Sequence, residues 1–151
     1  KQANLTDSNI PEVLTEMDLI DIGPVRMLSV PGELLPELAI GGYDGSHTNI
    51  GDYTDPIVNL DRENAADLSQ APEGPYLKDR MGRPFNWIIG LGNDEVGYII
   101  PEYNFVVDDR IPFIEEAGGD HYEETNSLGP RTAPMVLDWA QRLIAWTPDG
   151  Q

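Results

Sequence analysis

The stretch WIIGLGNDEVGYIIP, from Trp87 to Pro101, places a polar step between two apolar runs. The run before this step predicts a buried strand over 85–91. Burying a carboxylate without a partner costs several kcal/mol. We therefore expect the polar step, Asn93-Asp94-Glu95, to lie at the mouth of a cleft or beside an internal partner.

The segments before this stretch predict a β-hairpin and a short helix. Apolar and polar residues roughly alternate from Leu14 to Ile22, a Gly23-Pro24 turn follows, and Val25 to Val30 forms a second apolar run. Pro31-Gly32 ends this hairpin. A short helix is then expected from Glu33 to Leu38, with Glu33 near its start.

The segment after this stretch predicts one longer helix over 131–145. Trp139 and Trp146 are expected to cover the edges of that helix. Its apolar residues recur with helical spacing and form one face, made of Ala133, Val136, Leu137, Ala140, Leu143 and Ile144.

The remaining segments indicate loops. Residues 41–84 are rich in Gly, Asp, Asn and Pro and predict a long irregular region, with a short helix over 62–68. Residues 106–120 predict an acidic loop. A third of the basic residues lie close together in the sequence, at Lys78, Arg80 and Arg83. Such a cluster fits a solvated loop, or an anchor for an acidic neighbour or a substrate head group.

The combined pattern predicts one α+β unit over 1–151. We expect a mixed sheet with flanking helices and a long irregular loop region, as part of a larger α/β layered domain. So much loop is expected to leave apolar surface that needs cover. We therefore predict association with an upstream segment of the same precursor or with copies of the chain itself.

The composition limits the function classes. The formal net charge of -18 disfavours nucleic acid as a partner and favours solubility, an extracellular medium or calcium binding. Without cysteine there is no thiolate metal site, disulfide or Cys nucleophile. No apolar run is long enough for a transmembrane segment. The first residue is Lys1, and we expect a mature, processed or partial chain that is secreted or periplasmic.

Three short segments combine oxygen donors with glycine where an apolar run ends. They are SVPGELLPEL with Glu33, GLGNDEVGYIIP with Tyr98, and DHYEETNSLGP with His121, Tyr122 and Glu123. Such positions commonly build sites, because glycine lets the backbone approach closely. Each residue also has a structural interpretation, since Glu33 fits a first-turn helix acid, Tyr98 a half-buried core tyrosine and Glu123 a solvated face.

In their order and wording, these segments resemble the neutral/alkaline, non-lysosomal ceramidase family. The resemblance rests on Pro31-Gly32-Glu33, on Gly90-Leu91-Gly92-Asn93 with Tyr98, on Tyr122-Glu123, and on Gly129-Pro130 before the last helix. It covers roughly 14–144, with 41–84 poorly matched, and implies the C-terminal part of a ceramidase-like catalytic domain.

The resemblance implies a zinc-dependent hydrolase of lipid metabolism that cleaves the amide of ceramide-like N-acyl lipids. It implies that Glu33 and Tyr98 are zinc ligands, while the other ligands are histidines from earlier in the chain. Asn93, Asp94, Glu95, His121, Tyr122 and Glu123 are then expected around the cleft. No catalytic residue is assigned within this chain.

Two other interpretations compete with an enzyme completed by an upstream segment. One is a non-catalytic binding or structural module of the same fold, in which the acidic loops 41–55 and 106–110 bind calcium or the chain belongs to an extracellular assembly. The other is a local metal site made of Glu33, Tyr98 and the two histidines, His47 and His121.

Overall fold

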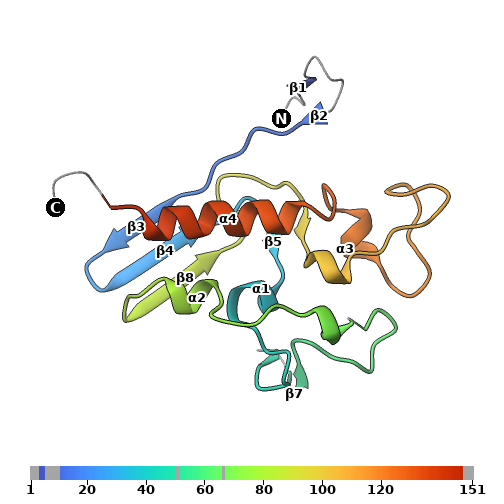
Figure 1. Ribbon diagram of the computed structural model, residues 1–151, viewed down its shortest axis with the longest axis horizontal. Helices are drawn as coiled ribbons and strands as arrows, with labels where there is room; N and C mark the ends of the chain where they lie inside the picture. The colour runs from blue at the N-terminus through green and yellow to red at the C-terminus, as the bar shows by residue number, and fades with distance from the viewer. Residues whose placement is uncertain (1–3, 6–10, 50–51, 66, 148–151) are drawn as a thin grey trace.

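The computed structural model describes residues 4–5, 11–49, 52–65 and 67–147. It has the expected α+β architecture, in which short strands and helices are joined by long loops (Figure 1). The strands are β1 (Asn4–Leu5), β2 (Pro11–Glu12), β3 (Leu19–Ile22), β4 (Val25–Ser29), β5 (Glu33–Leu34), β6 (Thr48–Asn49), β7 (Asp52–Pro56), β8 (Phe85–Ile89) and β9 (Tyr98–Ile99). The helices are α1 (Pro36–Ile40), α2 (Leu77–Arg80), α3 (Tyr122–Thr125) and α4 (Thr132–Ala145), with 3-10 turns η1 (Leu68–Gln70) and η2 (Glu102–Asn104).

The largest sheet has the order β3-β4-β8 and confirms both the hairpin and the strand after it. β3 and β4 are antiparallel and joined at Gly23, whose φ of 57° suits a residue without a side chain. β8 then pairs with β4 in parallel, with Met27 opposite Trp87. The mixed sheet is therefore built from a local hairpin and one distant strand.

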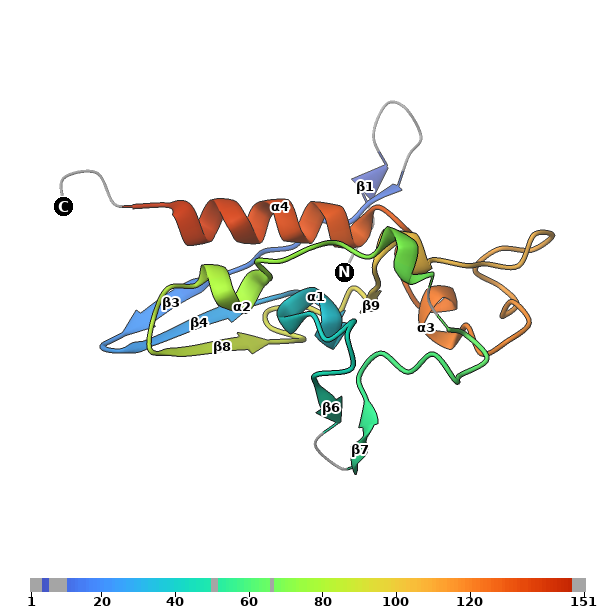
Figure 2. The same ribbon diagram turned by 60° about the horizontal axis from the view of Figure 1, so that its bottom comes forward.

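One face of this sheet carries the hydrophobic core. The predicted last helix is confirmed as α4, and α4 and α2 lie on the same side of the sheet (Figure 2). Leu28 of β4 is fully buried there, together with Met81 after α2 and Ala140 of α4. Burial of this apolar face holds α4 to the sheet. Trp139 and Trp146 do not cover its edges as expected, because they are 56% and 67% exposed.

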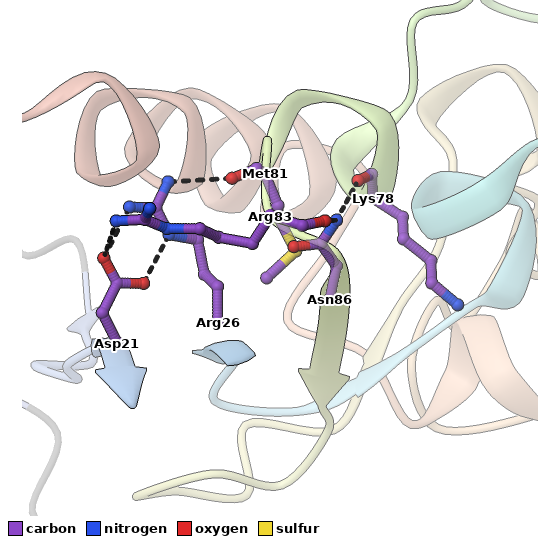
Figure 3. A network of polar contacts seen from close by, with 6 residues as sticks. All are labelled: Asp21, Arg26, Lys78, Met81, Arg83 and Asn86. Carbon is purple, nitrogen blue, oxygen red and sulfur yellow. Dashed lines mark hydrogen bonds and ion pairs between the residues drawn. The ribbon is translucent and has the colours of Figure 1, made fainter. Parts of the chain in front are cut away.

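A polar network fixes the end of the same sheet face to α2 (Figure 3). The Arg26 guanidinium donates two hydrogen bonds of 2.7 Å to the Asp21 carboxylate and one of 2.8 Å to the Met81 carbonyl. Arg83 donates to the same carboxylate at 3.1 Å. In the basic cluster, Arg83 thus acts as an anchor for an acidic neighbour.

β8 is not the buried strand that its apolar run predicts. Phe85, Trp87 and Ile89 are 57%, 56% and 44% exposed, whereas Asn86 and Ile88 between them are half-buried. Successive side chains of a strand point to opposite faces, and within the described residues only one face of this sheet has helices packed on it. An apolar run alone cannot reveal how many faces are covered.

The helix expected from Glu33 begins three residues later. Glu33 and Leu34 form strand β5 instead, and α1 begins at Pro36, a residue favoured in the first turn. Leu35 is extended, with ψ of 136°, as a residue before proline prefers. Pro36 therefore sets the helix start, and Glu33 remains in an extended segment.

The long region 41–84 is mostly irregular, as expected, with β6, β7, η1 and α2 as its regular elements. The helix expected over 62–68 is absent from the described part of that range. The Asp55 carboxylate binds Arg62 at 2.8 Å and holds a turn, and Asp67 caps η1 through the Ser69 backbone N–H. The acidic segment 106–120 contains no helix or strand, as predicted. In the part of the chain that the structure describes, no helix has the length and apolar character needed to cross a membrane.

Candidate metal centre

The candidate site is built where β5 pairs with β9. The two short strands run in parallel and place Glu33 directly opposite Tyr98. Before the strands, the Val96 N–H donates to the Pro31 carbonyl at 2.8 Å. The Glu33 N–H then donates to the Gly97 carbonyl at 3.0 Å. These backbone bonds bring the first two glycine-containing segments together.

Two glycines permit this approach. A Cβ on Gly32 would lie 2.3 Å from the Gly97 carbonyl oxygen, which no side chain tolerates. Gly97 has φ of +90°, and a Cβ there would lie 2.1 Å from the Asn126 carbonyl oxygen. Glycine is therefore required at both positions for the two segments, and for the loop after α3, to touch.

Glu33 and Tyr98 line one open pocket of about 330 Å³. Glu33 is exposed and Tyr98 is half-buried. The Tyr122 ring packs edge-on against Tyr98, with centroids 5.9 Å apart. The pocket is lined by Glu33, Glu95, Val96, Gly97, Tyr98, Tyr122, Asn126, Ser127 and Leu128.

The pocket keeps the phenol of Tyr98 in its neutral form. Desolvation is the largest cause that raises the pKa of Tyr98, followed by the negative charge of Glu33 and smaller effects of Tyr122 and Glu123. Glu123, one of the predicted cleft residues, thus acts on Tyr98 electrostatically without lining the pocket. A phenolate at this position needs a nearby positive charge.

Most of the polar step does not face the pocket. The Asn93 amide donates to the Asp18 carboxylate at 2.7 Å, and Asp94 accepts from the Thr15 hydroxyl at 2.7 Å. Only Glu95 lines the pocket. Asn93 and Asp94 therefore bind the segment before β3. That segment supplies the hydrogen-bond partners expected for polar residues between two apolar runs.

His121 is part of a buried pair beside the pocket. Its Nδ1 lies 2.8 Å from the Glu124 carboxylate, and both residues are almost fully buried. The His121 N–H donates to Glu116 at 2.8 Å. His121 is not among the lining residues, and these contacts fix the start of α3 that carries Tyr122.

The other histidine lies in a different pocket. His47 accepts or donates a 2.8 Å hydrogen bond with Ser46 and lines a pocket of about 550 Å³ with Tyr43 and Tyr76. Since neither His47 nor His121 lines the pocket of Glu33 and Tyr98, the geometry does not assemble the local four-residue metal site. Among the described residues, no group of three or more His, Asp or Glu could hold a metal ion.

The acidic loops use several carboxylates for local hydrogen bonds. Asp44 accepts from the Ser46 N–H, and Asp55 accepts from Asn59 and Arg62. Asp108 accepts from two backbone N–H groups that follow it. These contacts shape the loops that the sequence suggested for calcium, and calcium binding stays a prediction.

Sequence reasoning missed the contribution of Asn126. Its carbonyl accepts from the Tyr98 N–H at 3.1 Å, and the residue lines the pocket. Because the contact is made by the backbone, the side-chain pattern gives no sign of it. The only local sign is that Asn commonly ends a short helix, as it does after α3.

The open pocket is lined by two carboxylates, Glu33 and Glu95, and two phenols, Tyr98 and Tyr122. The directly opposed pair Glu33 and Tyr98 is a partial oxygen donor set for a metal ion. Comparison of the chain with protein-family models, curated proteins and solved structures gave no match.

Proposed function

We propose that the chain is the C-terminal part of the catalytic domain of a ceramidase-like zinc amidohydrolase that acts on ceramide-like N-acyl lipids. An upstream segment or chain completes the enzyme, in a secreted or periplasmic setting. The observation that carries the proposal is the opposition of Glu33 and Tyr98 in one pocket. These are the two residues to which the family resemblance assigns zinc ligation.

The donor chemistry fits this assignment in part. Zinc accepts carboxylate oxygen and is usually held by three protein ligands in catalytic sites, with one position left open. Glu33 and Tyr98 supply two oxygen donors, and among the described residues no group of three or more His, Asp or Glu could hold the ion. The proposal therefore requires histidine ligands from the upstream segment.

Zinc, when bound, would supply a Lewis acid for the amide carbonyl and lower the pKa of a water molecule. The chain's own residues set the proton balance of binding. Desolvation and the charge of Glu33 hold the proton on Tyr98, so ligation through the phenolate releases that proton. Zinc affinity at this pair is therefore expected to rise with pH.

The proposal is tested by zinc content and by hydrolysis of an N-acylsphingosine in the assembled protein. Glu33→Gln and Tyr98→Phe are each expected to lower both. Glu95→Gln and Tyr122→Phe are matched controls, because they remove the same chemical groups from the same pocket. The controls are expected to retain the zinc content of the wild type.

Unchanged zinc content in both Glu33→Gln and Tyr98→Phe would show that neither residue is a zinc ligand. It would also contradict the proposed amidase function. That result would favour the second interpretation, a binding or structural module. Equilibrium dialysis of the chain against calcium alone would then test whether the acidic loops bind that ion.

A further inference from the structure

The three-stranded sheet presents an apolar surface on the side opposite α4. Alternation along each strand separates these side chains from Leu28 and Ile88, which point into the core. We call this surface the open face, and its residues are Ile20, Ile22, Val25, Met27, Ser29, Phe85, Trp87 and Ile89.

The strand register makes the open face continuous. Ile22, Val25 and Phe85 form one row across the three strands. Ile20, Met27 and Trp87 form the next row. Neighbours within a row are close enough for their side chains to pack against each other. The surface is therefore one patch and not a set of isolated exposed residues.

Within the three strands, the open face carries no charged side chain. The charged residues of the same strands, Asp21 and Arg26, pair with each other on the other face, where Arg26 also donates to the Met81 carbonyl at the end of α2 (Figure 3). The single polar side chain, Ser29, is already engaged, because its hydroxyl accepts from the Asp18 N–H at 2.7 Å. The nearest charge is the Asp18 carboxylate at the Ser29 end of the face, and it accepts a hydrogen bond from the Asn93 amide at 2.7 Å.

The exposed area is large for a single protein surface. The five most exposed side chains are Ile20 at 46%, Ile22 at 61%, Phe85 at 57%, Trp87 at 56% and Ile89 at 44%. Together they expose roughly 500 Å² of apolar surface, near the upper end of what monomeric proteins leave uncovered. β4 and β8 are parallel, and all-parallel sheets usually have both faces covered.

We propose that a second copy of this chain covers the open face, with the two sheets packed face to face about a two-fold axis. A two-fold contact brings the same patch from each copy together, so an apolar, uncharged surface meets its equivalent. A standard stable interface buries about 800 Å² on each partner. The five side chains provide more than half of this, and Val25, Met27 and the sheet edges supply the rest.

Phe85 and Trp87, on edge strand β8, are the largest side chains of this interface. Aromatic side chains dominate binding energy when they are enclosed by other contacts, and these two lie beside the central strand β4. In the strand register they stand beside Val25 and Met27 of β4, which is close enough for side chains to pack against each other.

The charge of the chain predicts how salt acts on the dimer. Each copy carries a formal net charge of -18, so the two copies repel each other outside the apolar contact. Added salt screens this repulsion, with a Debye length of about 10 Å at 0.1 M ionic strength. The dimer is therefore expected to strengthen with salt, whereas association with a basic partner would weaken.

Sedimentation of the isolated chain tests the proposal. The wild type is expected to reach twice the 16.7 kDa mass of one chain at concentrations up to about 0.1 mM, and at lower concentration when salt is added. Trp87→Lys places a charge on the open face between Phe85 and Ile89 and is expected to yield a monomer. Trp139→Lys is the matched control, because Trp139 has the same exposed fraction of 56% but lies on α4.

Circular dichroism of each variant shows whether it folds. If Trp87→Lys does not fold, Ile22→Lys on the exposed edge strand replaces it, with the same expected loss of the dimer. A wild type that stays monomeric at every salt concentration would overturn the proposal. A folded Trp87→Lys that still dimerises, or a Trp139→Lys that does not, would move the interface away from the open face.

Discussion

Glu33 and Tyr98 occupy directly opposed positions in the parallel pair of β5 and β9. Their side chains reach the same pocket although 65 positions separate them in the sequence. The negative charge of Glu33 is one of the causes that raise the pKa of Tyr98. The two groups are therefore coupled electrostatically, and the pKa of Tyr98 depends on the charge of Glu33.

Removing the charge of Glu33 should lower the pKa of Tyr98. In Glu33→Gln the Coulombic cause disappears, while desolvation, the largest cause, remains. The pKa of Tyr98 is thus expected to fall but to stay above the ordinary value of about 10. Titration of ring-labelled tyrosine by NMR, with Tyr98→Phe for assignment, measures this shift. An equal pKa of Tyr98 in wild type and Glu33→Gln would show that the carboxylate and the phenol are not neighbours. Glu73→Gln removes a carboxylate elsewhere in the chain and serves as the control, with no expected change in the pKa of Tyr98.

Gly32→Ala should separate the two strands of the site. The new methyl group would meet the Gly97 carbonyl oxygen at 2.3 Å, so the Glu33–Gly97 hydrogen bond must break or the loop must move. Forcing a methyl group into so tight a contact costs about 1–3 kcal/mol of unfolding free energy. Urea denaturation measures this loss, and the coupling between Glu33 and Tyr98 should weaken with it.

Gly118→Ala is the matched control for that substitution. A Cβ at Gly118 meets no atom within 4 Å, and its φ is not in the left-handed region. This variant is expected to keep both the stability and the Tyr98 titration of the wild type. Equal stability of Gly32→Ala and Gly118→Ala would mean that β5 and β9 do not approach as closely as described.

Much of the fold could be predicted because its patterns are local. The hairpin of β3 and β4 follows from a turn at Gly23 between two apolar runs, and α4 follows from one helical stripe. The strand at Glu33 could not be predicted in this way. It contains two residues, and its partner β9 lies far along the chain. A two-residue strand gives no periodicity, so the position of Pro36 was the only local sign against a helix there.

The candidate site was predicted in part for similar reasons. Glu33 and Tyr98 stand in glycine-containing segments that the sequence singles out, and they share a pocket. Asn93 and Asp94 stand in the same segments but bind the segment before β3, because a turn can face either side of a strand end. The exposure of β8 also could not be predicted, since it depends on which layers cover the sheet.

Asp21 should contribute stability that is lost in acid. Its pKa is lowered, first by the hydrogen bonds from Arg26 and further by Arg83. A carboxyl with a lowered folded pKa stabilises the protein above its unfolded pKa of about 4, and this contribution disappears as pH falls toward the folded pKa. Asp21→Asn is therefore expected to lower Tm at neutral pH and to reduce the further decrease in Tm below about pH 4.

Asp138→Asn is the control for this acid effect. Asp138 pairs with Arg142 at 2.9 Å, but both side chains are more than half exposed, and such pairs contribute little. Its thermal unfolding curve should match that of the wild type at every pH. If Tm depended on pH in the same way in Asp21→Asn and in the wild type, the Asp21–Arg26 contact would not be the source of the acid effect.

Glu37 should show the opposite pH dependence. This residue of α1 is only 6% exposed, and burial raises the pKa of its carboxyl. It lies near the phenols of Tyr43 and Tyr103, and burial also raises the pKa of Tyr103 to about 12. A phenol is neutral or negative, so neither tyrosine provides a positive charge for the carboxylate.

For a carboxyl with a raised folded pKa, stability is greatest below the unfolded pKa and falls as pH rises through that value toward the folded pKa. Glu37→Gln removes the ionisable group while keeping its shape, so the variant is expected to have a higher Tm than the wild type at pH 7. The difference should vanish below about pH 4, where Glu37 is protonated in both states. Thermal unfolding at several pH values measures both effects, and Glu102→Gln, at an exposed position, should change neither. A lower Tm for Glu37→Gln at pH 7 would show that the buried carboxylate is stabilised by a positive group, and it would contradict the assignment of Glu37 as a destabilising charge.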